Sequence, residues 1–308
     1  MLQQIFESYG FLAVNIIIQM ILAMATAMPI RGGALSLASP AFFAMGGYVA
    51  AVFSTRIFDF SLAPPGSLLC LFYFLMECFV AVFLGVLVAL LIGLPVLKLR
   101  GVYFAIATLS FVEILRVICL NLEITGGAVG IFAIPQLFNS PAEYLILLIP
   151  IILLLILVIR KFEESSTGQE LIAICDDELA SQAVGIMVGK VRLKSFVLSG
   201  AIAALVGVPA AHIMNTWNAR QGTFDASVNT LAFVMVGGSR SMWGAILGAF
   251  VLTALPESLR FLQDSRLIVN GLCLLGAALF FPNGLWGALQ KVFVVVKKRN
   301  AKIGQQHD

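Results

Sequence analysis

The sequence predicts an all-α protein that crosses a membrane about eight to ten times. Hydrophobic residues make up 60% of the 308 residues and charged residues only 11%, whereas soluble domains carry about 25% charged residues. Several apolar runs are long enough to cross a bilayer as helices, which takes about 20 residues each. Gly-Gly pairs border or interrupt two of these runs, which is typical of the broken half-helices of transporters.

Seven continuous apolar runs are expected to form membrane spans. They cover residues 9–29, 34–57, 67–97, 101–120, 142–160, 195–214 and 267–289. An eighth apolar stretch, residues 228–259, contains VGGSRSMWG, which predicts two short helices that meet at a break. The first run has no basic start and no small-residue cleavage site after it, so we expect a retained span instead of a signal peptide.

The whole chain, residues 1–308, is expected to form one transmembrane domain with a weak internal repeat. GGALSLASPAFFAMGGYVAAVF (32–53) resembles GGSRSMWGAILGAFVLTAL (237–255), because each opens with two glycines and continues through a serine into small residues and Phe. The repeated halves would be about 1–160 and 195–296. The alternative is that Gly, Ala and Ser only mark close helix contacts.

The basic residues predict which side of the membrane faces the cytoplasm. Those next to the spans gather on one side when the spans are threaded in order: Arg31, Lys98, Arg100, Arg160 and Lys161. The loop 161–194 and the tail 297–308 belong to the same side. Because cytoplasmic loops carry an excess of Lys and Arg, we expect the C-terminus in the cytoplasm and the start of the chain outside.

Composition also argues against several kinds of ligand. The net charge is only +3 and the bases lie between or after apolar runs, which does not suit a nucleic-acid surface. The five cysteines form no CxxC pair, and the two histidines lie far apart in the sequence. We therefore expect no metal site and no cofactor in this chain, with membrane lipid as its surroundings.

The Gly-Gly segments are the candidate substrate pathway. The residues concerned are Gly32, Gly33, Ser36, Gly237, Gly238 and Ser241. A helix that starts at such a break would offer free backbone N–H groups and a partial positive charge, both of which favour a carboxylate.

Polar side chains within the spans form a second group of candidates, because they are costly in a membrane and are often functional. Glu113 and Arg116 are three residues apart and are expected to pair on one helical face, either as a structural ion pair or in the pathway. Asn15 and Gln19 lie four apart and suit helix–helix hydrogen bonding better than ligand contact. Glu77 lacks a local partner, so we expect one on another helix.

One polar stretch, CDDELASQAVGIMVGKVRLK (175–194), separates two apolar spans. Asp176 and Asp177 are expected to begin a short helix, and Gly185 is well placed to end it. Apolar residues recur between them at helical spacing and would form a small apolar face. A simple connection would need far fewer residues. We therefore expect an amphipathic helix outside the membrane that fits a groove on a partner.

Four stretches of the sequence carry a resemblance to a known family. They are GGALSLASPAFFAMGGYVAA (32–51), FAIATLSFVEILRVICLNLEITGGAVGIFAIP (104–135), GQELIAICDDELASQAVGIMVGKVRLKSFVLSGAIAALVG (168–207) and VMVGGSRSMWGAILGAFVLTALPESLR (234–260). Together they resemble the permeases of branched-chain amino-acid ABC transporters, the LivM/LivH type. The chain departs from that pattern at Arg240, where the family usually has Gly, and at Ala245, where it has Pro.

The resemblance implies a permease subunit of an importer in the bacterial inner membrane, without an ATPase site of its own. GIMVGKVR (185–192) has three residues between its glycines, and Val191 stands where a phosphate loop needs Ser or Thr. ATP and Mg²⁺ would therefore bind to partner subunits. The implied partners are two cytoplasmic ATPase subunits, a second related permease and an extracytoplasmic solute-binding protein.

The resemblance also makes the polar stretch the element that couples the permease to the ATPase. The residues concerned are Asp176, Asp177, Glu178, Leu179, Ala180, Ala183 and Gly185. The small residues would allow close approach, and the acidic ones would meet bases on the partner. Three alternatives stay open: the same machinery with urea, amides, other amino acids or a sugar as cargo, an ion-coupled secondary transporter, and an anchoring subunit of a membrane enzyme.

Overall fold

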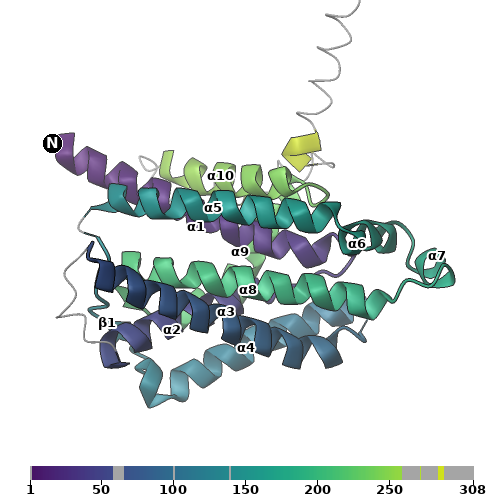
Figure 1. Cartoon of the computed structure of the whole chain (residues 1–308), viewed down its shortest axis with the longest axis horizontal. Helices are drawn as coiled ribbons and strands as arrows, with labels where there is room; N and C mark the ends of the chain where they lie inside the picture. Colours follow the sequence, from purple (N-terminus) through teal and green to yellow (C-terminus); the bar gives the residue numbers. More distant parts are fainter. Residues whose placement is uncertain are drawn as a thin grey trace, which may run out of the picture.

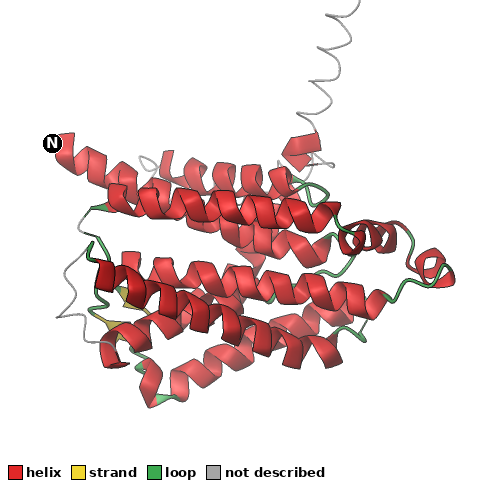
Figure 2. Cartoon of the chain, viewed as in Figure 1, coloured by secondary structure: helices red, strands yellow, loops and turns green. Residues whose placement is uncertain are grey.

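The computed structural model describes residues 2–57, 66–99, 101–138, 140–258, 271 and 284–287, and helices dominate this part of the chain (Figures 1 and 2). The α-helices are α1 Leu2–Ile30, α2 Ser39–Val52, α3 Leu68–Val96, α4 Val102–Asn121, α5 Pro141–Glu164, α6 Ser166–Asp176, α7 Glu178–Ala183, α8 Val188–Met214, α9 Phe224–Gly237 and α10 Met242–Ser258. Shorter elements are η1 Phe53–Ile57, η3 Glu123–Thr125, η4 Ala219–Gln221, β1 Ile131–Phe132 and β2 Thr216–Trp217. The predicted all-α class is confirmed.

Five described helices are long and apolar enough to cross a membrane, namely α1 from Tyr9 onward, α3, α4, α5 and α8. They correspond to the predicted spans at 9–29, 67–97, 101–120, 142–160 and 195–214. The predicted broken stretch is also present, because α9 and α10 meet at an angle of 118°. The predicted span 267–289 lies almost wholly outside the described residues.

The predicted span 34–57 is wrong in its first part. Residues 34–38 are not helical, and α2 begins only at Ser39. Pro40 lies in the first turn of α2, where proline is tolerated because its missing N–H would have no partner within the helix, so it marks a helix start. Small residues on both sides of this point allow the irregular chain to pack inside the protein.

Helix α8 forms the centre of the bundle and packs against α1, α2 and α3. Its contact with α2 is close, because a Cβ atom at Gly207 would lie 2.2 Å from the carbonyl oxygen of Phe43. A Cβ atom at Gly46 would likewise lie 1.9 Å from the carbonyl oxygen of Ala204. Close backbone approach of this kind provides the van der Waals contact that holds helices together in a membrane.

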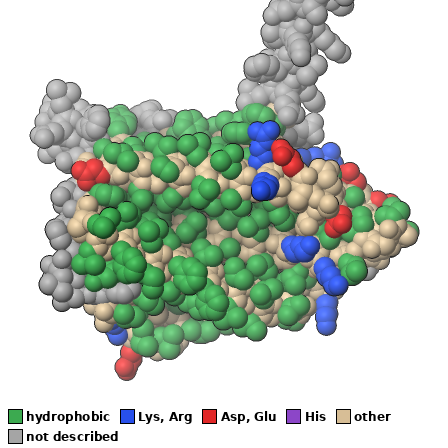
Figure 3. All heavy atoms as spheres, viewed as in Figure 1, with side chains coloured by type: hydrophobic (Ala, Val, Ile, Leu, Met, Phe, Trp, Pro, Cys, Tyr) green, Lys and Arg blue, Asp and Glu red, His purple; other side chains and the backbone are tan. Residues whose placement is uncertain are grey.

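The two ends of the bundle differ in chemistry. At one end, which we call the α7 end, α6 and α7 project beyond the long helices (Figure 1). Figure 3 shows most of the visible Lys, Arg, Asp and Glu side chains near this end and a broad apolar surface along the bundle. The opposite end, the β1 end, carries the short β1–β2 pair. This pattern is that of a membrane-embedded bundle with a polar segment on one side.

A short antiparallel sheet closes the β1 end. Ile131 pairs with Trp217, and Phe132 pairs with Thr216. Trp217 is fully buried and its Nε1 donates to the carbonyl oxygen of Ala44, 3.0 Å away. Gly47 leaves the space for the indole ring, because a Cβ atom there would lie 2.0 Å from it. The loop before α5 and the end of α8 are thereby fixed to α2.

Candidate functional site

A buried, non-helical segment leads from the end of α1 into the middle of the bundle. Near its inner end, the Leu37 N–H donates to Thr108 Oγ1 of α4 at 3.1 Å, and Ser39 Oγ lies 3.5 Å from Ser199 Oγ of α8. Ser199 lies about 16 Å along α8 from Val188, at 1.5 Å per residue. α2 therefore begins inside the bundle and not at its α7 end.

The two glycine pairs lie at the outer end of the irregular segments, at the α7 end. The N–H groups of Gly32 and Gly33 donate to the carbonyl oxygens of Pro29 and Ile30, both at 3.0 Å. The Gly238 N–H likewise donates to the carbonyl oxygen of Val234, at 2.9 Å. The N–H groups of these three glycines are therefore occupied by hydrogen bonds at the helix ends. The expectation concerned the helices that start after the breaks, and these begin only at Ser39 and Met242. Gly33 and Gly238 have positive φ and end α1 and α9, as glycine commonly does after a helix.

The serines of the predicted pathway take separate places. Ser36 is buried within the irregular segment, and its Oγ accepts from the Ala38 N–H at 3.4 Å. Ser241 lies at the α9–α10 break and lines a cavity of about 430 Å³ at the α7 end, together with Arg31 and Asp176. The structure thus places the two breaks on the same side of the bundle.

A polar cavity of about 340 Å³ lies deeper, between α1, α2, α9 and α10. Its polar lining consists of Asn15 and Gln19 of α1, Gln221 before α9, Asn229 and Thr230 of α9, and Thr253 of α10. The apolar lining includes Leu22, Pro40, Phe43, Ala226, Phe233 and Leu252. Gln19 and Thr253 each lie about 16 Å along their helices from the α7 end, at 1.5 Å per residue. The cavity is therefore near mid-depth.

The polar groups that line this cavity are amides and hydroxyls without charge. An amide both donates and accepts hydrogen bonds, so the lining can contact both an ammonium and a carboxylate group. Thr253 Oγ1 is buried and has no hydrogen-bond partner among the described residues. The volume falls in the lower part of the range typical of small-molecule pockets, about 300–1,000 Å³. The cavity thus suits a small polar or zwitterionic solute held without a strong ion pair.

Sequence reasoning found part of this lining and missed the rest. Asn15 and Gln19 were expected to join helices, and the structure places both on the cavity wall. Asn229, Thr230 and Thr253 were not singled out, because a lone amide or hydroxyl in an apolar run is common. Only their shared cavity distinguishes them.

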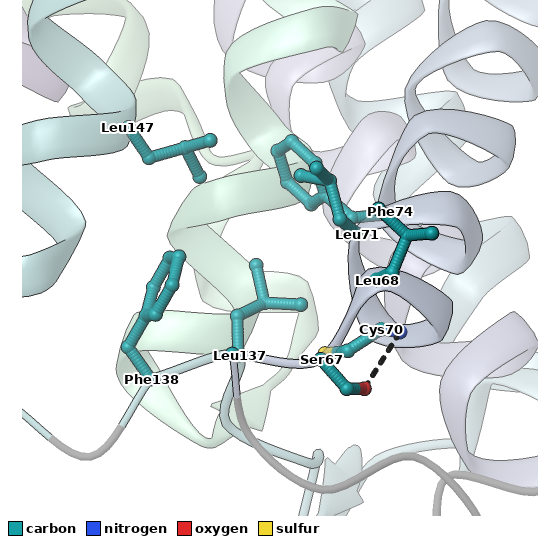
Figure 4. Close-up of a pocket in the computed structure, with 9 residues that line it drawn as sticks. Ser67, Leu68, Cys70, Leu71, Phe74, Leu137, Phe138 and Leu147 are labelled. Carbon is teal, nitrogen blue, oxygen red and sulfur yellow. Dashed lines mark hydrogen bonds between the residues drawn. The ribbon is translucent and has the colours of Figure 1, made fainter.

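A second cavity, of about 160 Å³, lies at the β1 end and differs in chemistry. Figure 4 shows Leu68, Phe74, Leu137 and Leu147 around it. Ser67 contributes a hydroxyl group to this lining (Figure 4). Its Oγ accepts a hydrogen bond from the Cys70 N–H at 3.2 Å, at the start of α3. With its polar groups occupied in this way, this cavity is a poor candidate for a polar solute.

Glu77 has the cross-helix partner that was expected. Its Oε2 lies 2.6 Å from Nε2 of His212 on α8, and both side chains are fully buried. Nδ1 of the same ring lies 2.7 Å from the carbonyl oxygen of Pro135. A carbonyl oxygen only accepts, so Nδ1 carries a hydrogen and one further proton lies between Nε2 and Oε2. This pair joins α3, α8 and a loop, and it lies outside the polar cavity.

Glu113 and Arg116 pair as expected, at 2.9 Å. Their side chains are 41% and 37% exposed. They do not line the polar cavity. The described residues also hold no group of three or more His, Cys, Asp or Glu side chains that could bind a metal ion.

The polar segment forms a short helix that projects from the α7 end (Figure 1). Asp177 caps α7, because its Oδ1 accepts from the N–H groups of Leu179 at 2.9 Å and Ala180 at 3.0 Å. Gly185 follows the helix with φ of +89°. Asp176 ends the preceding helix α6 and does not begin α7, so that part of the expectation is wrong.

The apolar residues of this segment point in two directions. Ile186 packs against the cluster of α6 and α8 that includes Leu171 and Val191. Leu179 is 72% exposed and Val184 78% exposed. Ala180 and Ala183 are also exposed. The outward apolar surface of α7 is therefore formed by Leu179, Val184 and the small residues between them.

Glu178 contacts a base of its own chain, whereas it was expected to meet a base on a partner. Its Oε2 lies 3.0 Å from Nη2 of Arg192 on α8. Arg192 is largely buried, with a side chain that is only 11% exposed. The sequence signal for this burial is helical spacing. Arg192 lies four residues after Val188 and three before Ser195, and both of these residues are buried.

Residues 8–281 match the model of the family described as the branched-chain amino acid transport system permease component. The chain belongs to this family. Its permease relatives include proteins with different named cargoes. The chain is 33% identical over 226 residues to the high-affinity branched-chain amino acid transport system permease protein LivM of Escherichia coli, which covers 63% of the chain and 53% of LivM.

Two further relatives of this permease family are named for other solutes. The ribose import permease protein RbsC of Haemophilus influenzae is 28% identical over 222 residues, with 64% of the chain and 68% of RbsC covered. The autoinducer 2 import system permease protein LsrC of Yersinia enterocolitica is 28% identical over 222 residues, with 67% and 59% covered. The match covers only about half of the length of LivM. No solved structure matches the chain with significance.

Proposed function

We propose that this chain is a membrane-spanning permease subunit of an ABC importer in the bacterial inner membrane. Membership of the permease family supports this proposal, and the polar cavity near mid-depth is the observation that carries it. Broken helices that meet near mid-membrane are the usual setting of a transporter substrate site. Here the first turn of α2 and both helices of the broken α9–α10 pair line the cavity, and the α9–α10 break itself lies at the α7 end.

The proposed cargo is a branched-chain amino acid. The amides of Asn15, Gln19 and Asn229 can meet the ammonium and carboxylate groups, and Phe43 and Phe233 offer apolar contact to a branched side chain. A site without charged side chains would hold this solute weakly, so that it can leave toward the cytoplasm. Selection of the solute is assigned to a separate extracytoplasmic binding protein.

Sugar import is the second candidate, and one observation favours it. Amides and hydroxyls are also the groups that bind sugar hydroxyls, and the chain is similar to a permease named for ribose. An amino acid carries an ammonium and a carboxylate group and a sugar carries neither, and competition between the two solutes separates the proposals.

The proposed partners of the permease follow from its surfaces. The exposed apolar residues of α7, at the polar end of the bundle, provide a small surface for a cytoplasmic ATPase subunit. ATP and Mg²⁺ would bind to two such subunits. A second related permease would complete the pair of membrane subunits, and the binding protein would deliver solute at the β1 end.

The test is uptake of labelled leucine by cells that express the complete transporter with variants in the cavity. We expect Gln19→Leu and Asn229→Leu each to lower uptake about tenfold. This is the effect of losing roughly 1.4 kcal/mol of binding free energy. Asn121→Leu is the matched control, because Asn121 is an exposed amide at the end of α4, away from the cavity.

Competition then identifies the cargo. Excess isoleucine or valine should abolish leucine uptake, whereas ribose and urea should leave it unchanged. Wild-type uptake that ribose blocks and isoleucine does not would replace the amino-acid proposal with the sugar one. Uptake that persists without ATP would instead support a secondary transporter and contradict the ABC importer.

A further inference from the structure

One arginine of α8 joins the α7 segment to the end of α1. Arg192 Nε donates to the carbonyl oxygen of Gly32 at 2.9 Å, and its Nη2 donates to Glu178 Oε2 at 3.0 Å. The side chain of Arg192 is 11% exposed and that of Glu178 is 27% exposed. A single guanidinium group therefore contacts the first residue of α7 and the turn that follows α1.

The chemistry of this contact requires arginine. The planar guanidinium directs several N–H groups along fixed directions, so it can hold a carbonyl and a carboxylate at the same time. Its hydrogen bond to a carboxylate is charge-assisted and about twice as strong as a neutral one. A lysine ammonium is a single point of charge and would lose one of the two fixed contacts.

The turn that Arg192 holds is closely packed. A Cβ atom at Gly33 would lie 3.4 Å from Arg192 Nη2, and one at Gly32 would lie 2.5 Å from Leu171 Cδ1 of α6. Arg31, just before the turn, pairs with Glu163 near the end of α5. Burial lowers the pKa of Arg31 to about 10, so this side chain still carries its charge at pH 7. The end of α1 is thereby fixed to α5, α6 and α8.

The turn continues directly into the wall of the polar cavity. Residues 34–38 are not helical and lead to α2, whose Pro40 lines the cavity. This segment has no helical hydrogen-bond ladder of its own, so a displacement of the Gly32 carbonyl can pass along it. Arg192 itself is fixed on α8, the central helix of the bundle.

We propose that Arg192 is a positioning residue that transmits movement of α7 to the irregular segment before α2, and so to the polar cavity. This inference rests on the proposed function, because it assigns the path by which ATP hydrolysis changes the site. When α7 moves with a bound ATPase subunit, Glu178 displaces the guanidinium group, and the Gly32 carbonyl follows it.

The experiment compares transport with ATP hydrolysis in the complete transporter, reconstituted in proteoliposomes with its binding protein. Glu178→Gln removes the charge with almost no change in size, and Arg192→Gln removes the guanidinium group but keeps a polar amide. We expect each to lower the amount of leucine taken up per ATP hydrolysed by about fivefold or more, the lower end of typical coupling between sites. Lys190→Gln is the control, because Lys190 is an exposed base of the same helix.

Further variants separate coupling from a structural role. The double variant should be no worse than Arg192→Gln alone, because that change already breaks the contact between Arg192 and Glu178. Arg192→Lys should take up more leucine per ATP hydrolysed than Arg192→Gln, but less than the wild type. A parallel fall in uptake and hydrolysis, or an unchanged ratio, would overturn the proposal. If Arg192→Gln does not assemble, Glu178→Gln decides alone. Wild-type transporter without ATP-dependent uptake would count against the proposed function instead.

Discussion

The buried pair of Glu77 and His212 holds ionisable groups where no water can reach them. The two side chains are fully buried and lie 2.6 Å apart, and Glu77 Oε1 has no hydrogen-bond partner among the described residues. Removing one member of a buried pair leaves the other uncompensated, which typically costs about 3–5 kcal/mol. Each member of the pair is therefore needed to satisfy the other at the junction of α3, α8 and the loop at Pro135.

We predict that His212→Ala strongly lowers the thermal stability of the purified protein in detergent, because it leaves the Glu77 carboxyl group without its partner. Glu77→Gln should cost much less, since the amide can still donate to Nε2 of the neutral ring. Circular dichroism during heating measures both. Equal losses of melting temperature in the two variants would contradict a role for the shared proton.

At the scale of elements, small residues decide how closely α2 and α8 approach. Gly207 and Gly46 face backbone atoms of the opposite helix that cannot move aside as a flexible side chain could. The shape of this contact matters because lipid competes equally well for apolar surface, so burial alone does not drive helices together.

We predict that Gly207→Ala destabilises the protein by about 1–3 kcal/mol, the usual effect of overpacking. Gly189→Ala is the matched control on the same helix, because a Cβ atom there meets nothing within 4 Å. It should leave stability unchanged or raise it by about 0.5–1 kcal/mol, since alanine favours a helix. Thermal unfolding of the two variants provides the comparison. A neutral Gly207→Ala would show that the α2–α8 contact can relax.

Across the whole molecule, the distribution of basic residues predicts that the α7 end faces the cytoplasm. Arg160, Lys161, Lys190 and Lys194 are all exposed near the α7 end, and cytoplasmic segments carry an excess of such residues. An α7 that binds a cytoplasmic ATPase needs this orientation.

We predict that a membrane-impermeant maleimide labels the two ends differently in intact cells. Cys175 is exposed at the α7 end and should be protected until the membrane is opened. Val129→Cys, in a cysteine-free background, places a thiol at an exposed position near the β1 end and should react at once. The reverse pattern would place α7 outside the cell and remove its proposed partner.

Much of the architecture could be predicted from sequence because it depends on local composition. Apolar runs of about 20 residues predict spans wherever the membrane is the solvent, and five of the expected spans are present. Asp177 and Gly185 were placed correctly at the two ends of α7, because helix caps depend on neighbouring residues. The family resemblance rested on motifs spread along the chain, and the family model that matches residues 8–281 confirmed it.

The site depended on contacts between residues far apart in the chain. The sequence by itself determined an all-α membrane protein, most of its described spans and its permease family. Only the tertiary structure decided that Gln19, Asn229 and Thr253 share one cavity, and that Arg192 holds Gly32 and Glu178 together. The physical reason is that a hydropathy pattern is a property of each segment, whereas the rotation of each helix is set by packing against its neighbours.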